Sequence, residues 1–188
     1  MQKAEDKKMI RLKNANDLKM LRQSGRILKE TLQTLKNSAK EKTSLRSLDL
    51  TARRLLNEAG AKPAFLGYKP DDRSKPYPDA ICASVNAVVV HGLPDDYRLK
   101  SGDLLKIDIG VNYKGFYTDS ALTIPIGKIS SKAARLLETG KEALIKAISA
   151  AKAGSTTGDI GFIIQRTAED AGFKVIKELT GHGIGFEL

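Results

Sequence analysis

The chain has 188 residues, 41% hydrophobic and 29% charged, and this composition is ordinary for one soluble globular domain. The sequence holds no apolar run of about 18 residues and no apolar segment behind its charged start, so it predicts neither a membrane span nor a signal peptide. A single cysteine, Cys82, excludes an internal disulfide, and together these features predict a cytoplasmic protein.

The net charge of +10 is the one unusual bulk property. Basic surfaces attract phosphate backbones without reading their sequence. The lysines and arginines are spread along the chain, however, and no zinc-finger, RNA-recognition or helix-turn-helix pattern accompanies them. The sequence therefore predicts a general attraction to RNA-rich partners and no specific nucleic-acid site.

Hydrophobic periodicity predicts two helices in the first part of the chain. After a polar leader over residues 1–15, Asn16 is the candidate N-cap of an amphipathic helix of about five turns. A second helix is predicted from Ser44 as N-cap, with Gly60 as the residue that terminates it.

The middle of the chain predicts an exposed loop followed by short strands. Residues 69–79 are rich in proline and charge, which is typical of a surface loop. Apolar and β-branched residues then predict strands over residues 80–85 and 88–90.

A β-hairpin is predicted next, with strands over residues 104–112 and 116–124. If residues 113–114 form a two-residue turn, Asp108 lies directly opposite Asp119. Opposed side chains there are about 5 Å apart at Cβ, where like charges destabilise a sheet.

This carboxylate pair needs either a bound cation or a proton. Carboxylate and imidazole ligands suit divalent Mn, Co, Fe or Zn. The alternative is a solvated surface pair, and a register shift of one residue would separate the two side chains.

Two further helices are predicted after the hairpin. One begins at Ser130 or Ser131 and the other ends at Gly172. The order helix, helix, strand therefore occurs twice, which indicates an internal duplication. On this interpretation the first half covers about residues 16–128, and the second half, about residues 129–188, is incomplete.

Four short motifs follow one another in the order SVNAVVVHGLP, IDIG, GFYTDSA and GHGIG. With these motifs the chain, over residues 18–188, resembles the type I methionine aminopeptidases. The resemblance implies an α+β pita-bread fold, shared with creatinase and prolidase, that is built on a pseudo-twofold helix-helix-strand repeat. It also implies metal-dependent removal of the initiator methionine from nascent proteins.

By this resemblance, Asp108, Asp119 and His182 are ligands of a site for two divalent metal ions (Co, Mn, Fe or Zn), and Asp119 bridges the two ions. His91 would be the catalytic and substrate-binding histidine near the scissile amide, where a neutral imidazole can hydrogen-bond to the substrate. Asn86 completes the motif as structural support.

The resemblance further implies a pocket for the methionine side chain. Soft aromatic and sulfur contacts suit a thioether. The pocket residues are Phe65, Tyr68, Tyr77 and Cys82. Each of these four could equally be ordinary core, and the KPDDRSKP stretch between the two tyrosines is longer than the family pattern.

In the family, two glutamates complete the metal site and a second histidine follows GHGIG closely, and none of the three has a counterpart before Leu188. Three ligands shared by two ions hold each one weakly. The sequence therefore predicts an incomplete fragment with little or no aminopeptidase activity of its own.

Two other functions are compatible with the sequence. One is a non-catalytic pita-bread protein that binds peptide, ribosome or RNA, and the other is a hydrolase acting on X-Pro peptides or creatine. The predicted partners are the N-terminal methionine of nascent polypeptides and, as a second candidate, the ribosome. No specific nucleic acid and no membrane are expected, and a monomer is expected.

Overall fold

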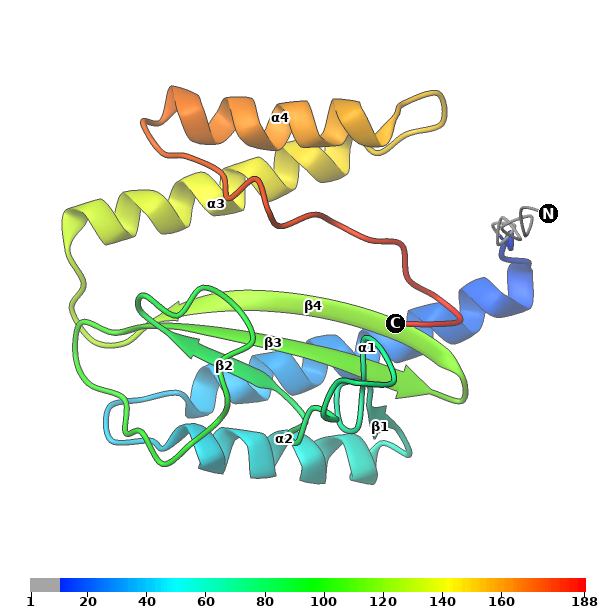
Figure 1. Ribbon diagram of the computed structural model, residues 1–188, viewed down its shortest axis with the longest axis horizontal. Helices are drawn as coiled ribbons and strands as arrows, with labels where there is room; N and C mark the ends of the chain where they lie inside the picture. The colour runs from blue at the N-terminus through cyan, green and yellow to red at the C-terminus, as the bar shows by residue number, and fades with distance from the viewer. Residues whose placement is uncertain (1–10) are drawn as a thin grey trace.

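The computed structural model describes residues 11–188, in which one antiparallel sheet of four strands is accompanied by helices (Figure 1). The central strand is β3 (Leu104–Tyr113). The short strands β1 (Lys62–Pro63) and β2 (Cys82–Val85) pair with one edge of β3, and β4 (Phe116–Pro125) pairs along the other.

Two pairs of helices lie on opposite sides of this sheet. Helices α1 (Ala15–Ser38) and α2 (Leu45–Glu58) cover one face, whereas α3 (Ser131–Ala150) and α4 (Thr157–Asp170) lie on the other side (Figure 1). This α+β arrangement follows the predicted order of elements. The division into two halves stays a prediction.

The core lies between the sheet and the first helix pair. Alternate residues of β3 are fully buried, and they pack against leucines of α1 and α2. Burying one such side chain contributes roughly 1.5 to 3 kcal/mol. The intervening residues of β3 face the second helix pair and form what we call the site face of the sheet. The buried set is Leu105, Ile107, Ile109 and Val111, and the site-face set includes Lys106, Asp108 and Gly110.

Helix caps follow the sequence closely, with one exception. Ser44 and Ser130 are N-caps, as predicted. The predicted cap Asn16 is wrong, because α1 begins two residues earlier behind Asn14. The Asn14 side chain accepts the Asp17 N–H at 3.0 Å, and the Asp17 carboxylate accepts the Asn14 N–H at 3.0 Å, so a reciprocal capping box selects this start.

The predicted strand over residues 88–90 is absent. Asn86 has a φ of +50°, which turns the backbone out of the sheet, and the three valines that follow are between 42% and 49% exposed. Most of the predicted polar leader, residues 1–10, lies outside the described residues. Within residues 11–188, no helix is long and apolar enough to cross a membrane.

The hairpin turn lies one residue later than predicted, at Lys114 and Gly115. Both have positive φ values, +54° and +84°, which is the pattern of a type I′ turn. Glycine adopts this conformation without strain, and the Asn112 carboxamide accepts the Gly115 N–H at 2.9 Å. The glycine therefore selects the turn.

This turn changes the partners of both carboxylates. Asp119 pairs with Gly110, and Asp108 pairs with Ala121, so the direct opposition of Asp108 and Asp119 was wrong. Moving the turn by one residue changes the pairing register by two residues. Side chains alternate with a period of two, so Asp108 and Asp119 stay on the same face of the sheet. Asp108 and Asp119 are diagonal neighbours on the site face.

Candidate metal centre and substrate site

The two carboxylates lie on the site face in a partly dry environment. Burial, reinforced by the charge of Asp119, raises the pKa of Asp108 to about 7. Burial also raises the pKa of Asp119. Neighbouring carboxyl groups with raised pKa values resist carrying two negative charges together. A positive charge between them would remove this conflict.

Asp119 also carries an unsatisfied oxygen. Among the described residues 11–188, its Oδ1 atom is buried and has no hydrogen-bond partner. A buried carboxylate oxygen left without a partner costs free energy unless a ligand or ion occupies its lone pairs. The carboxylate pair therefore fits a divalent cation, for which carboxylate oxygens are suitable ligands.

His182 reaches this pair from the C-terminal segment. Gly185 accepts the Tyr117 N–H at 2.6 Å, and the Phe186 ring packs on Phe116 with centroids 5.5 Å apart, so the segment is held against β4. This contact places His182 Nε2 3.9 Å from Asp119 Oδ2.

The tautomer of His182 suits a metal ligand. Its Nδ1 lies 3.1 Å from the carbonyl oxygen of Gly183, and a carbonyl can only accept, so Nδ1 donates. In the neutral ring the lone pair is then on Nε2, the atom that faces Asp119.

His182 is the outlying member of the set. Its side chain is 59% exposed, and within residues 11–188 no three histidine, cysteine or acidic side chains lie close enough together to hold an ion as they stand. The candidate centre therefore consists of a preformed carboxylate pair with an imidazole beside it.

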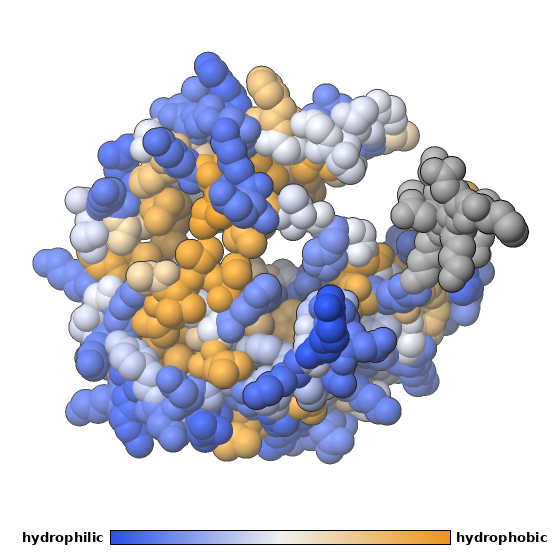
Figure 2. Space-filling view, viewed as in Figure 1, coloured by the Kyte–Doolittle hydropathy of each residue, from blue (hydrophilic) through white to orange (hydrophobic). Residues whose placement is uncertain are grey.

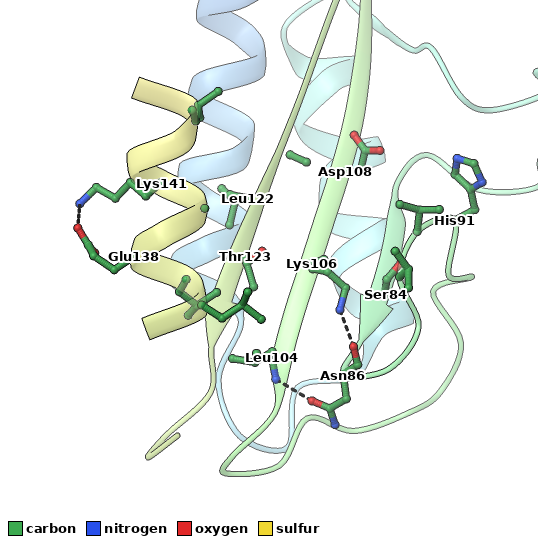
Figure 3. A pocket seen from close by; sticks show the side chains of 17 residues that line it. Ser84, Asn86, His91, Leu104, Lys106, Asp108, Leu122, Thr123, Glu138 and Lys141 are labelled. Atoms are coloured by element: carbon green, nitrogen blue, oxygen red, sulfur yellow. Dashed lines mark hydrogen bonds and ion pairs between the residues drawn. The ribbon is translucent and has the colours of Figure 1, made fainter. Parts of the chain in front are cut away.

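A cavity of about 740 Å³ opens between the site face and α3. Figure 3 shows Asp108 on β3 and His91 on the loop after β2 at one end of this cavity, with Lys106 and Asn86 at the other. Leu136 and other apolar residues of α3 line the opposite wall, and hydrophobic side chains gather around this hollow (Figure 2). His91 and Asp108 thus line one accessible cavity.

Of the side chains predicted to form the methionine pocket, Phe65 and Cys82 lie next to the site-face residues Gly110 and Asp108. The Phe65 ring meets Tyr77 edge to face at 6.5 Å, and it packs so closely on Gly110 that a Cβ there would lie 2.9 Å from the ring. Cys82 is buried and pairs with Asp108 across the β2–β3 ladder.

Tyr68 is less enclosed, with 45% of its surface exposed. It is joined to its neighbours by backbone hydrogen bonds, because Phe65 accepts the Tyr68 N–H and Tyr68 accepts the Tyr77 N–H, each at 2.9 Å. The long loop between these tyrosines therefore returns to its starting point, which brings Tyr77 beside Phe65.

No motif in the sequence singles out Asp103 or Lys106. Both contact Asn86, the residue at which the chain leaves β2 for His91. Asp103 is 6% exposed, and burial of a carboxylate is the signal that sequence alone does not display.

A carboxylate pair with an imidazole beside it is a donor set that fits a metal-dependent hydrolase. Residues 19–188 match the metallopeptidase family M24, and the chain belongs to this family. Divalent metal use follows from that membership.

Within this family, the chain is similar to methionine aminopeptidases. It is 43% identical to the methionine aminopeptidase of Aquifex aeolicus over 177 residues, which cover 94% of this chain and 69% of that protein. It is 39% identical to methionine aminopeptidase 1 of Bacillus subtilis, covering 96% of this chain and 70% of that protein.

Solved structures agree with this comparison. The crystal structure of methionine aminopeptidase from Thermotoga maritima superposes with a TM-score of 0.90 at 33% identity, covering 95% of this chain and 70% of that one. The prolidase from Pyrococcus furiosus superposes with a TM-score of 0.81 at 24% identity, which shows the shared fold alone. The predicted pita-bread fold is confirmed.

Proposed function

We propose that this protein removes the N-terminal methionine from polypeptides by metal-dependent hydrolysis. The observation that carries the proposal is the 43% identity with a methionine aminopeptidase over 94% of the chain. The geometry supports it, because His182 lies beside Asp119, Asp119 is a diagonal neighbour of Asp108, and Asp108 and His91 line one cavity.

Asp108, Asp119 and His182 would hold the metal. The raised pKa of Asp108 and the unsatisfied oxygen of Asp119 support this assignment. Divalent Co, Mn, Fe or Zn held there would supply Lewis acidity for the scissile carbonyl and for the attacking water.

The other residues would bind and orient the substrate. A neutral His91 imidazole would hydrogen-bond to the scissile amide and hold it in the cavity. The apolar surface of Phe65, Tyr77, Tyr68 and Cys82 would enclose the methionine side chain and exclude water from it. The N-terminal methionine of a polypeptide is the substrate group that fits both contacts.

Residues 11–188 offer three ligands for this centre, and one of them is largely exposed. Three ligands divided between two ions leave each ion weakly held. We therefore expect low metal affinity and slow turnover from these 188 residues alone. The ribosome as a partner, the monomeric state and the cytoplasmic location stay predictions.

The test is methionine release from a Met-Ala-Ser peptide during long incubation with excess Mn²⁺ or Co²⁺. We expect slow release that requires the added metal and is lost in Asp108→Asn. The matched control, Asp72→Asn, removes an exposed loop carboxylate and should release methionine at the wild-type rate.

Two outcomes would contradict the proposal. These are release that persists in Asp108→Asn and preferential cleavage of an Xaa-Pro peptide. Preferential Xaa-Pro cleavage would assign the protein a prolidase activity instead.

A further inference from the structure

The loop that carries His91 has little packing of its own. It begins at Asn86 and ends at His91, and both residues adopt left-handed backbone conformations, with φ values of +50° and +56°. Between them, Val88, Val89 and Val90 are nearly half exposed. A segment with few buried contacts keeps one conformation only if its ends are fixed.

The start of the loop is fixed through Asn86. Its backbone N–H donates to the Leu104 carbonyl at 3.0 Å, and its side-chain Oδ1 accepts the Leu104 N–H at 2.9 Å. Lys106 Nζ donates to the Asn86 carbonyl at 2.8 Å, and these contacts cross to β3 (Figure 3). The remaining polar group, Nδ2, donates to Asp103 Oδ1 at 2.9 Å.

Asp103 accepts the hydrogen bond from Asn86 Nδ2 as a buried carboxylate. The carboxyl group is buried, and its second oxygen accepts the Tyr97 hydroxyl at 3.0 Å and the Lys100 N–H at 2.9 Å. Burial opposes ionisation, but the bonds from Lys100, Asn86 and Tyr97 outweigh it and leave the pKa of Asp103 below its usual value. An ionised carboxylate can only accept, so it fixes the Asn86 amide with Nδ2 toward Asp103 and Oδ1 toward Leu104.

The far end of the loop is fixed independently. The Gly92 carbonyl accepts the Ala83 N–H at 2.8 Å, and the Gly92 N–H donates to Ser84 Oγ at 3.0 Å. These bonds do not involve Asp103 or Asn86. Loss of the first anchor should therefore loosen the loop without detaching it.

We propose that Asp103 and Asn86 form a positioning pair that sets the conformation of the His91 loop and thereby directs the imidazole at the cavity. Asp103 acts through Asn86 and does not itself reach the substrate space. The catalytic consequence rests on the proposed function of His91, whereas the positioning of the ring does not.

The test reads the imidazole directly. The protein contains two histidines, so ring NMR signals of His91 and His182 can be assigned with a His182→Gln variant. We expect Asp103→Asn to shift or broaden the His91 signals, because its amide can turn an N–H toward Asn86 Nδ2, and to leave the His182 signals unchanged. The matched control, Asp96→Asn, removes a carboxylate whose side chain is 85% exposed and should change neither ring.

A charge swap provides the decisive variant. Asn86→Asp alone faces Asp103 with a second carboxylate and should disturb His91. Combined with Asp103→Asn, it restores one donor and one acceptor, and the wild-type His91 signals should return at least in part. Unchanged His91 signals in folded Asp103→Asn, or equal disturbance in the swap and the single variants, would overturn the proposal.

If Asp103→Asn folds poorly, Asn86→Gly is the second variant to test. Glycine favours the positive φ at this position but lacks the side-chain amide that bonds to Asp103. Displaced His91 signals in Asn86→Gly would support the proposal, and unchanged signals would overturn it. These spectra need neither metal nor substrate. A failure of the proposed function would therefore appear as methionine release that His91→Ala does not affect, and would leave the ring readout intact.

Discussion

Cys82 on β2 lies directly across the sheet ladder from Asp108 on β3, so the thiol and the carboxyl group share the site face. The cysteine is 4% exposed. Burial raises the pKa of the Cys82 thiol to about 11, and the negative charge of Asp108 acts in the same direction. The thiol therefore stays protonated at neutral pH.

Cys82 should react very slowly with thiol reagents in the folded protein. At pH 8, a pKa of about 11 leaves roughly 100-fold less thiolate than an unperturbed cysteine, and burial slows access further. Reaction with Ellman's reagent in native buffer and in guanidinium measures the difference. The chain has one cysteine, so the unfolded protein is its own control, and equal rates would contradict the buried position.

Asp119 should be the ligand on which metal affinity depends most, because its unsatisfied oxygen is already buried beside Asp108. Even the loss of an outer-shell partner weakens metal sites 10- to 100-fold, so Asp119→Asn should weaken Mn²⁺ binding by about 100-fold in calorimetry. His182→Gln should have a smaller effect, since that side chain is 59% exposed.

Asp119→Asn should weaken metal binding but stabilise the metal-free protein. Removing one of two neighbouring like charges relieves repulsion worth up to about 1 kcal/mol. Thermal unfolding in a chelator should therefore show a higher Tm for Asp119→Asn than for wild type. Equal Mn²⁺ affinities, or a lower metal-free Tm, would argue against the carboxylate pair as the metal centre.

The strand pattern of the hairpin could be predicted from sequence, but its register could not. Period-two alternation places Asp108 on the face opposite Ile107 in any register, so the site face follows from the sequence. The pairing depends on which two residues form the turn. The glycine at position 115 selects it through its positive φ, one residue later than expected.

Some residues of the candidate site could likewise be predicted from the sequence, and others could not. Asp108, Asp119, His182 and His91 occur in recognisable motifs; in the fold His182 lies beside Asp119, and Asp108 and His91 line one cavity. Asp103 lies in an ordinary stretch of sequence. Its burial depends on packing between segments far apart in the chain, which local patterns do not encode.

Two glycine substitutions should change stability in opposite directions. A Cβ on Gly92 would lie 2.6 Å from the Ala83 carbonyl oxygen and 2.9 Å from Ser84 Cα, and these backbone atoms cannot move aside. Gly92→Ala should cost about 1 to 3 kcal/mol, as overpacking does. A Cβ on Gly140, within α3, would meet no atom within 4 Å. Gly140→Ala should stabilise by about 0.5 to 1 kcal/mol. Urea unfolding measures both, and changes of the same sign would contradict the packing described for the His91 loop.

Asp103 should contribute stability that depends on pH. Its folded-state pKa is lowered, because hydrogen bonds from Lys100, Asn86 and Tyr97 outweigh burial, whereas the unfolded value is about 3.9. Below that unfolded value the unfolded chain binds more protons, so the stabilisation is fully present above about pH 4 and is lost as pH falls through the folded pKa. Asp103→Asn should therefore lower the free energy of unfolding by about 1 to 3 kcal/mol at pH 7 and flatten its decline in acid. Urea unfolding between about pH 2.5 and 7 measures this, with the exposed Asp96→Asn as control. If wild type and Asp103→Asn lose stability in parallel below pH 4, the Asp103 carboxylate does not hold the loop in its ionised form.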